Sequence, residues 1–183
     1  LVLAGAFGVL VPATSLPTPV RMALIVGPAL ALAALTRASA PFARWLRGLD
    51  RRRMTALHLV RLPIGAAFLA LGERGLLAPE FARAAGGGDV VAAVLLGLVV
   101  LAWRESRGFH AFAFAANLFG ALDFMNVFRT VNALAAAGRN AELALFDSPA
   151  AAVPFCVVPV LLFTHGVLLA EHGRALAGRS PQR

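Results

Sequence analysis

Six apolar stretches separated by polar linkers run through this sequence, and they limit its possible folds more than any other feature. A helix needs about 20 apolar residues to cross the hydrocarbon core of a bilayer, and these stretches reach or approach that length. They cover residues 1–13, 19–35, 54–77, 90–103, 109–137 and 151–170. The pattern predicts an all-α fold, a polytopic transmembrane helical bundle with about six spans in a single domain over residues 1–183. If the short stretch 1–13 does not cross, five spans remain.

The composition argues against a soluble protein. The chain is 60% hydrophobic and only 14% charged, whereas about 25% of the residues in soluble domains are charged. A soluble fold of this size leaves too much surface in contact with water to hide so many apolar side chains. All 17 basic residues are arginines, and the net charge is +8. A basic chain can indicate nucleic acid, but these arginines cluster between the apolar stretches, where basic residues set membrane topology. We therefore expect a lipid bilayer as the partner and no nucleic acid.

The arginines are divided unevenly between the two sets of loops. The loops on one face, together with the C-terminal tail, carry eleven arginines, and the loops on the other face carry three. Because basic loops stay in the cytoplasm, we expect a cytoplasmic C-terminus. The abundance of arginine and alanine is typical of a GC-rich bacterial genome, so the expected location is a bacterial inner membrane.

One arginine-rich linker, around residues 41–53, carries a second periodic pattern. Its apolar side chains Phe42, Trp45, Leu46 and Leu49 recur at helical spacing. Such a segment lies in the membrane interface as an amphipathic helix, with its arginines towards anionic headgroups.

The linker before the fourth span contains a run of glycines, Gly86-Gly87-Gly88-Asp89. This run predicts a flexible turn, with Asp89 as the N-cap of the fourth span. Glu80 and Arg83 belong to the same outer loop. The only cysteine, Cys156, lies in an apolar stretch and is expected to be a small buried hydrophobe.

Ionisable side chains inside a bilayer are costly, so each one is a candidate functional residue. A helical rise of about 1.5 Å per residue gives their expected depths. These depths form two layers. The inner layer contains His58, Arg61, Asn117 and His165, and the outer layer contains Asp123 followed by Asn126 and Arg129.

The outer carboxylate, Asp123, needs a partner from another helix. Arg61 is one candidate, although its expected depth is about 10 Å nearer the cytoplasm. In the alternative, Arg61 extends along the helix so that its charge reaches the headgroups.

Several chemistries are compatible with these residues. His58 and His165, on different spans at similar depth, could be the axial ligands of a b-type haem. The two layers could instead bind a solute or relay a proton, or the polar groups could hold the helices together. A zinc site would need three or four convergent ligands, which the sequence does not supply at one depth. No motif of a soluble enzyme is present, so no catalytic residue is predicted and a membrane-embedded enzyme ranks last.

Four segments carry a resemblance to a known group of proteins. They are LHLVR at 57–61, GLLAPEFA with AGGGD at 75–89, NLFGALD at 117–123, and VPF at 153–155 with His165. In these segments the chain resembles a family of small, uncharacterised bacterial multi-spanning inner-membrane proteins. The resemblance implies a helical membrane fold over roughly residues 57–165 and implies no activity.

Two functions are therefore expected. In the first, the polar layers of an integral membrane protein bind or pass a small solute or a proton. In the second, the chain is an accessory subunit of a larger membrane complex for electron transfer or photosynthesis, where it stabilises partners or holds a haem, pigment or quinone. Its partners would be other membrane subunits or further copies of itself. No cofactor is predicted, and a b-type haem on His58 and His165 stays as the alternative.

Overall fold

The computed structural model describes residues 16–104, 106–139, 142 and 149–178, and all the regular structure in this part of the chain is helical. Five helical stretches in it are long and apolar enough to cross a membrane. They are Thr18–Ala38, Arg51–Glu73, Pro79–Leu101, Arg107–Ala136 and Val153–Leu176. The predicted span 1–13 lies outside the described residues.

Two of these stretches are single α-helices and three are composite. The single helices are α2 (Thr18–Ala38) and α8 (Arg107–Ala136). The second stretch joins α4 (Arg51–Ala56), a 3-10 turn (Leu57–Val60) and α5 (Arg61–Glu73). The third joins α6 (Pro79–Phe81), a π-helical turn (Ala82–Gly87) and α7 (Gly88–Leu101). The fifth joins a π-helical turn (Val153–Val157) to α9 (Val158–Leu176), after a 3-10 turn at Pro149–Ala151.

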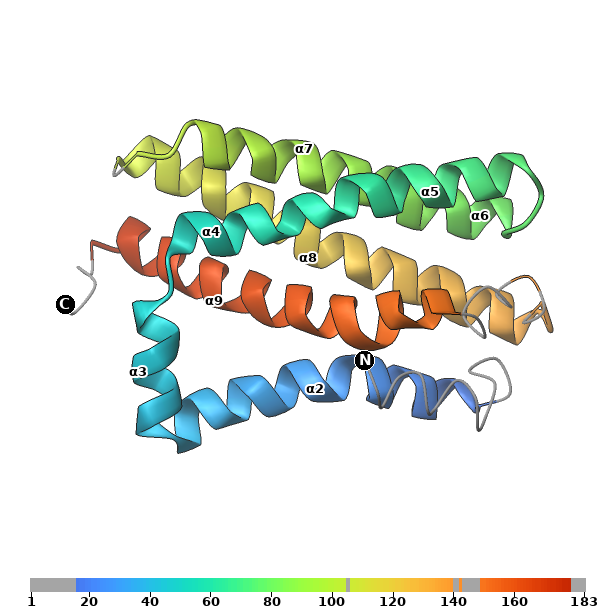
Figure 1. Ribbon diagram of the computed structural model, residues 1–183, viewed down its shortest axis with the longest axis horizontal. Coiled ribbons are helices and arrows are strands. Elements are labelled where there is room, and N and C mark those ends of the chain that lie inside the picture. The colour runs from blue at the N-terminus through green and yellow to red at the C-terminus, as the bar shows by residue number, and fades with distance from the viewer. Residues whose placement is uncertain (1–15, 105, 140–141, 143–148, 179–183) are drawn as a thin grey trace.

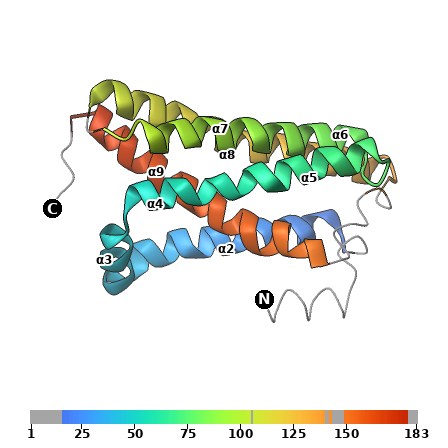
Figure 2. The same ribbon diagram turned by 45° about the horizontal axis from the view of Figure 1, so that its top comes forward.

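The long helices run side by side, and the short helix α3 (Ala40–Gly48) crosses one end of the bundle (Figures 1 and 2). Helix α8 lies between α7 and α9, α5 packs on α7, and α2 packs mainly on α9. The end that carries α3 also holds the turn between α7 and α8 and the C-terminal end of α9 (Figure 1). The arginine-rich linkers of the sequence therefore meet at one end of the molecule.

Helix α3 is shorter than the amphipathic segment predicted for residues 41–53. Ser39 caps it by accepting a hydrogen bond from the Phe42 amide, and Asp50 caps the next helix by accepting from the Arg52 and Arg53 amides. Both are favourable N-cap residues, so the chain bends between them and starts the second long stretch at Arg51. Within α3, Leu46 is buried against Met54 and Leu168, while Trp45 is 58% exposed.

The prediction of a turn at Gly86-Gly87-Gly88 is wrong, because the third helical stretch passes through all three residues without a break. The glycines allow two helices to approach closely. A Cβ atom on Gly86 would lie 2.8 Å from the Gly65 carbonyl oxygen, and one on Gly65 would lie 2.7 Å from the Gly86 carbonyl oxygen. Small residues serve this purpose in packed membrane helices. The turn occurs earlier, at Gly75, whose φ of 70° suits glycine at a helix C-terminus.

A further expectation about burial is wrong, because Cys156 is exposed and not buried. His172, near the C-terminal end of α9, is buried, and its Nδ1 lies 3.1 Å from Nδ1 of His110.

Candidate functional site

A buried arginine lies at the middle of the bundle. Arg61, the first residue of α5, is 1% exposed. Its Nε donates to Asp89 Oδ1 at 2.6 Å, and its Nη2 donates to Asp123 Oδ2 at 2.5 Å. Its Nη1 donates to the Gly120 carbonyl oxygen at 3.2 Å, and the guanidinium carbon lies 4.4 Å from the centre of the Phe124 ring. All three guanidinium nitrogens are thus bound inside the protein, and the alternative in which Arg61 reaches the headgroups is wrong.

Three helical stretches bring these charges to a common depth. Counted from the α3 end of the bundle at about 1.5 Å per residue, Arg61 lies about 15 Å in, Asp89 about 18 Å in and Asp123 about 24 Å in. The guanidinium at the end of a long side chain spans the remaining difference. The predicted separation of Arg61 and Asp123 into two layers is therefore wrong, because both belong to one cluster with Asp89. The sequence placed Asp89 in an outer loop because it started the fourth span at residue 90, whereas the helix begins at Pro79.

A chain of neutral polar groups continues from Arg61. The side-chain amide of Asn117 donates to the Ala113 carbonyl oxygen at 2.9 Å, so its oxygen faces His165 Nδ1 at 3.0 Å. That oxygen can only accept, so Nδ1 carries the proton and the Nε2 of a neutral His165 is left as an acceptor. Arg61 Nη1 lies 3.3 Å from this Nε2, at a distance that suits donation to it. The geometry therefore defines His165 as a neutral tautomer beside the guanidinium.

The second predicted histidine, His58, packs directly against the first. The ring centres of His58 and His165 are 4.0 Å apart, and His58 Nε2 lies 3.0 Å from Thr164 Oγ1. Within the described part of the chain, His58 Nδ1 is buried without a hydrogen-bond partner. A haem with two axial imidazoles needs the porphyrin plane between the rings. Rings in contact leave no room for it, so this arrangement does not fit a bis-histidine haem.

The remaining predicted site residues lie away from Arg61. Asn126 and Arg129 are exposed on α8, and Arg83 is exposed on the third helical stretch. Glu80 forms a surface ion pair with Arg139, with Arg139 Nη1 to Glu80 Oε1 at 3.0 Å. The structure therefore brings together His58, Arg61, Asn117, Asp123 and His165, adds Asp89 to them, and excludes Asn126, Arg129, Glu80 and Arg83 from direct contact.

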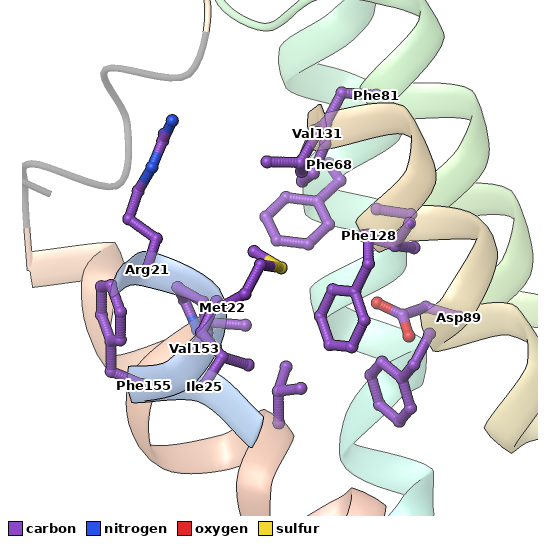
Figure 3. A pocket seen from close by; sticks show the side chains of 15 residues that line it. Arg21, Met22, Ile25, Phe68, Phe81, Asp89, Phe128, Val131, Val153 and Phe155 are labelled. Carbon is purple, nitrogen blue, oxygen red and sulfur yellow. The ribbon is translucent and has the colours of Figure 1, made fainter. Parts of the chain in front are cut away.

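Two hollows reach the two carboxylates from different sides. The first lies between α2, α5, α8 and the Val153–Val157 turn, has a cavity volume of about 80 Å³, and includes Asp89 in its lining. In Figure 3 Asp89 and Phe128 lie on the same side of this hollow, opposite the α2 residues Met22 and Ile25. Its wall is otherwise almost entirely apolar and includes Phe68, Phe81, Phe124 and Phe155. The second hollow is more open to the outside, and it reaches Asp123 between Gly88, Arg83 and Asn126.

Two glycines and a threonine of this site were missed by the sequence reasoning. A Cβ atom on Gly120 would lie 2.5 Å from His165 Cε1, and one on Gly88 would collide with the Asp123 carboxylate. Their absent side chains make the space that the polar groups occupy. The segment NLFGALD contained a signal for Gly120, since its glycine is three residues before the buried carboxylate and therefore on the same helix face. Nothing in the sequence pattern marks Thr164 as the partner of His58.

Metal binding is not supported by the arrangement of the described residues, because no three of their histidine, cysteine, aspartate or glutamate side chains converge on one point. The site is an ion-pair cluster with one guanidinium, two carboxylates and a neutral imidazole. Such a cluster can exchange protons or hold a charged ligand.

Comparison with known proteins gives one match. A family model described as a domain of unknown function, DUF8737, matches residues 18–171. No curated protein and no solved structure matches the chain. The matched range contains all the residues around Arg61.

Proposed function

Because the chain belongs to the family described as a domain of unknown function, DUF8737, we propose its function from the Arg61 site itself. We propose an integral membrane protein in which Asp89 and Asp123 bind or pass a proton or a small solute. The observation that carries this proposal is the charge of the site, in which one guanidinium faces two buried carboxylates.

Membrane insertion is supported by the outer surface of the bundle. Large apolar side chains are exposed on the long helices, among them Leu30 at 63% and Leu122 at 58%. Lipid tails are a favourable environment for such a surface, and water is not. We place the arginine-rich end, with α3 and the end of α9, in the cytoplasm of a bacterium and the inner membrane around the five long stretches.

The charges at the centre do not cancel. His165 is neutral in the arrangement described above, so Arg61 is the only cation among the described residues in direct contact with the two carboxylates. With both carboxylates ionised the cluster carries one net negative charge. An uncompensated charge in a low-dielectric interior is costly. The surplus carboxylate is therefore expected to hold a proton or a cationic ligand, and to exchange one for the other.

Access to the carboxylates supports passage in addition to storage. The hollow lined by phenylalanines leads to Asp89, and the open hollow beside Gly88 leads to Asp123. Arg61 bridges the two carboxylates, so a proton or cation on one of them changes the interaction of Arg61 with the other. This bridge gives the site two arrangements through which a charge could move.

The test is proton flux into liposomes that contain the purified full chain and a pH-sensitive dye. We expect the wild type to dissipate a pH gradient faster than empty liposomes, and Asp89→Asn and Asp123→Asn to remove that difference. Glu80→Gln is the matched control, because it neutralises a carboxylate that pairs with an arginine at the surface. Repeating the assay with sodium, potassium or small organic amines on one side tests a cationic solute. Wild-type rates equal to those of empty liposomes under all these gradients would overturn the proposal.

A second function, the accessory subunit, is favoured by one observation. The hollow beside Asp89 has phenylalanines on several sides, and aromatic side chains pack favourably against a ring such as that of a quinone or pigment. Gentle purification from the native membrane tests this reading, because it predicts companion chains on a gel and an absorption band from the bound ring. A colourless single chain would contradict it.

A further inference from the structure

A groove runs along one side of the bundle, between α2 and α9, and ends beneath α3. It has a cavity volume of about 620 Å³ and is partly open to the outside. Its wall is apolar for most of that length, with Val26 and Leu30 from α2 and Leu162 and Phe163 from α9. It is separate from the Arg61 site and from both hollows beside it.

Four arginines from four different helices line the α3 end of this groove. They are Arg37, Arg47, Arg51 and Arg174. Arg51 is already bound, since it forms an ion pair with Glu171 and donates to the Leu46 carbonyl oxygen. Among the described residues, no carboxylate forms an ion pair with any of the other three. The groove therefore combines an apolar wall with three uncompensated positive charges at one end.

We propose that this groove binds an anionic phospholipid, with the headgroup phosphate among Arg37, Arg47 and Arg174 and an acyl chain along α2 and α9. Guanidinium groups bind phosphate oxygens strongly and with defined geometry. Basic pockets between membrane helices at the cytoplasmic side are a known form of anionic-lipid site. The proposal rests on the membrane orientation proposed above and does not depend on proton or solute passage.

The dimensions of the groove fit one lipid leaflet. From Val26 to Arg37, α2 rises about 16 Å, at about 1.5 Å per residue. One leaflet is half of a hydrocarbon core of about 30 Å, which is about 15 Å. A phosphate bound by the arginines would thus place the end of its acyl chain near Val26. The amphipathic helix α3, with Trp45 exposed, lies at the level where headgroups and interfacial aromatic residues meet (Figure 1).

The experiment measures lipid binding to the full chain in neutral detergent micelles, by native mass spectrometry during titration with phosphatidylglycerol or phosphatidylcholine. We expect phosphatidylglycerol to bind at least tenfold more tightly than phosphatidylcholine. The double variant Arg47→Gln/Arg174→Gln should lose about thirty-fold in affinity, which is the effect of two arginines near an anionic headgroup. The control Arg44→Gln/Arg104→Gln removes the same charge at the same end of the bundle, from exposed residues that do not line the groove, and should change affinity less than threefold.

A second variant tests the acyl chain and separates a lipid from a free phosphate. Gly166 lines the groove with open space beside it, so Gly166→Trp should fill the apolar part. Gly27 on α2 also has open space beside it but does not line the groove, so Gly27→Trp is the control. We expect Gly166→Trp to reduce phosphatidylglycerol binding at least tenfold and Gly27→Trp to leave it unchanged. If inorganic phosphate still competes with phosphatidylglycerol for binding to Gly166→Trp, this result would support the arginines as the headgroup half of the site.

Four results would overturn the proposal. Three are equal affinity for the two lipids, equal losses in the two double-arginine variants, and full binding by Gly166→Trp. The fourth is inorganic phosphate that binds as tightly as the lipid, which would assign the arginines to a soluble anion instead. None of these results bears on proton flux, so the lipid site and the Arg61 site can fail separately.

Discussion

The molecule contains two arginines that each hold two carboxylates, in opposite environments. Arg61 pairs with Asp89 and Asp123 in the interior, where its side chain is 1% exposed. Arg139 pairs with Glu80 and Glu142 at the far end of the bundle, where its side chain is 38% exposed. The donor and acceptor groups are of the same types and the distances are similar, so the comparison isolates the effect of the surroundings.

The difference shows what burial does to an ion pair. Water and salt screen the Arg139 cluster, so each of its members can lose its partner at little cost. In the Arg61 cluster, removal of one member leaves a charge that water cannot reach. The outer cluster can therefore contribute a little stability and no more, whereas the inner cluster makes its three charges depend on one another. A change in protonation would therefore affect the remaining charges more strongly in the inner cluster than in the outer one.

The largest expected effect comes from removing the inner cation. Arg61→Met leaves Asp89 and Asp123 buried without a cation, and breaking a buried pair in this way costs about 3–5 kcal/mol. We expect a strong loss of folded protein, measured as yield and melting temperature of the detergent-solubilised chain by size-exclusion chromatography. Arg139→Met removes the same charge from the surface cluster and should melt close to the wild type. Equal losses in the two variants would show that burial is not what distinguishes the clusters.

A smaller loss is expected from filling the space beside the inner cluster. A Cβ atom on Gly120 would lie 2.5 Å from His165 Cε1 and 3.1 Å from Arg61 Nη1, so Gly120→Ala should destabilise the protein by about 1–3 kcal/mol. Gly27→Ala is the matched control, because no atom lies within 4 Å of its added Cβ. Alanine favours a helix over glycine by about 1 kcal/mol, so this control should stabilise. A lower melting temperature for Gly120→Ala and a higher one for Gly27→Ala would support this explanation by packing. A change in the same direction in both variants would contradict it.

The two clusters also differ in how far the sequence could predict them. Apolar length and spacing were enough to predict helices throughout the described residues and the arginine-rich end. The cost of polar groups in a bilayer was enough to select Arg61, Asp123, Asn117 and both histidines, which the structure brings together. The depth of Asp89 was missed because Gly86-Gly87-Gly88 was interpreted as a turn, whereas the helix runs through it from Pro79. The close approach of Gly86 to Gly65 is a contact between residues distant in the sequence. Depths calculated from residue numbers along each helix also do not show that the long side chain of Arg61 reaches both Asp89 and Asp123. The surface cluster of Arg139 had no periodic signal at all.

An intermediate variant separates charge from packing at the centre. Asp123→Asn keeps the size of the side chain and an oxygen that can accept from Arg61, while it removes the surplus negative charge. If one carboxylate of the wild type already holds a proton, the amide resembles that state. Stability should then change by less than about 1 kcal/mol, since an isosteric polar group retains its hydrogen bond. Chemical unfolding in mixed micelles measures the change, and a loss as large as that of Arg61→Met would mean that both carboxylates are ionised and required.

The smallest expected effect is the pH dependence of the surface cluster. The hydrogen bond from Arg139 lowers the pKa of Glu142 below its usual value, and the positive charge of Arg139 acts in the same direction. A carboxylate whose pKa is lower in the folded state stabilises the protein above its unfolded pKa, and this contribution is lost as the pH falls through the folded pKa. The melting temperature of the wild type relative to Arg139→Met should therefore show a small constant difference at neutral pH that disappears in acid. Because the cluster is exposed, added salt should reduce the difference at every pH. A difference that grew on acidification would have the wrong sign for a carboxylate paired with arginine, and would place the stabilising role of Arg139 in its packing against the end of α8.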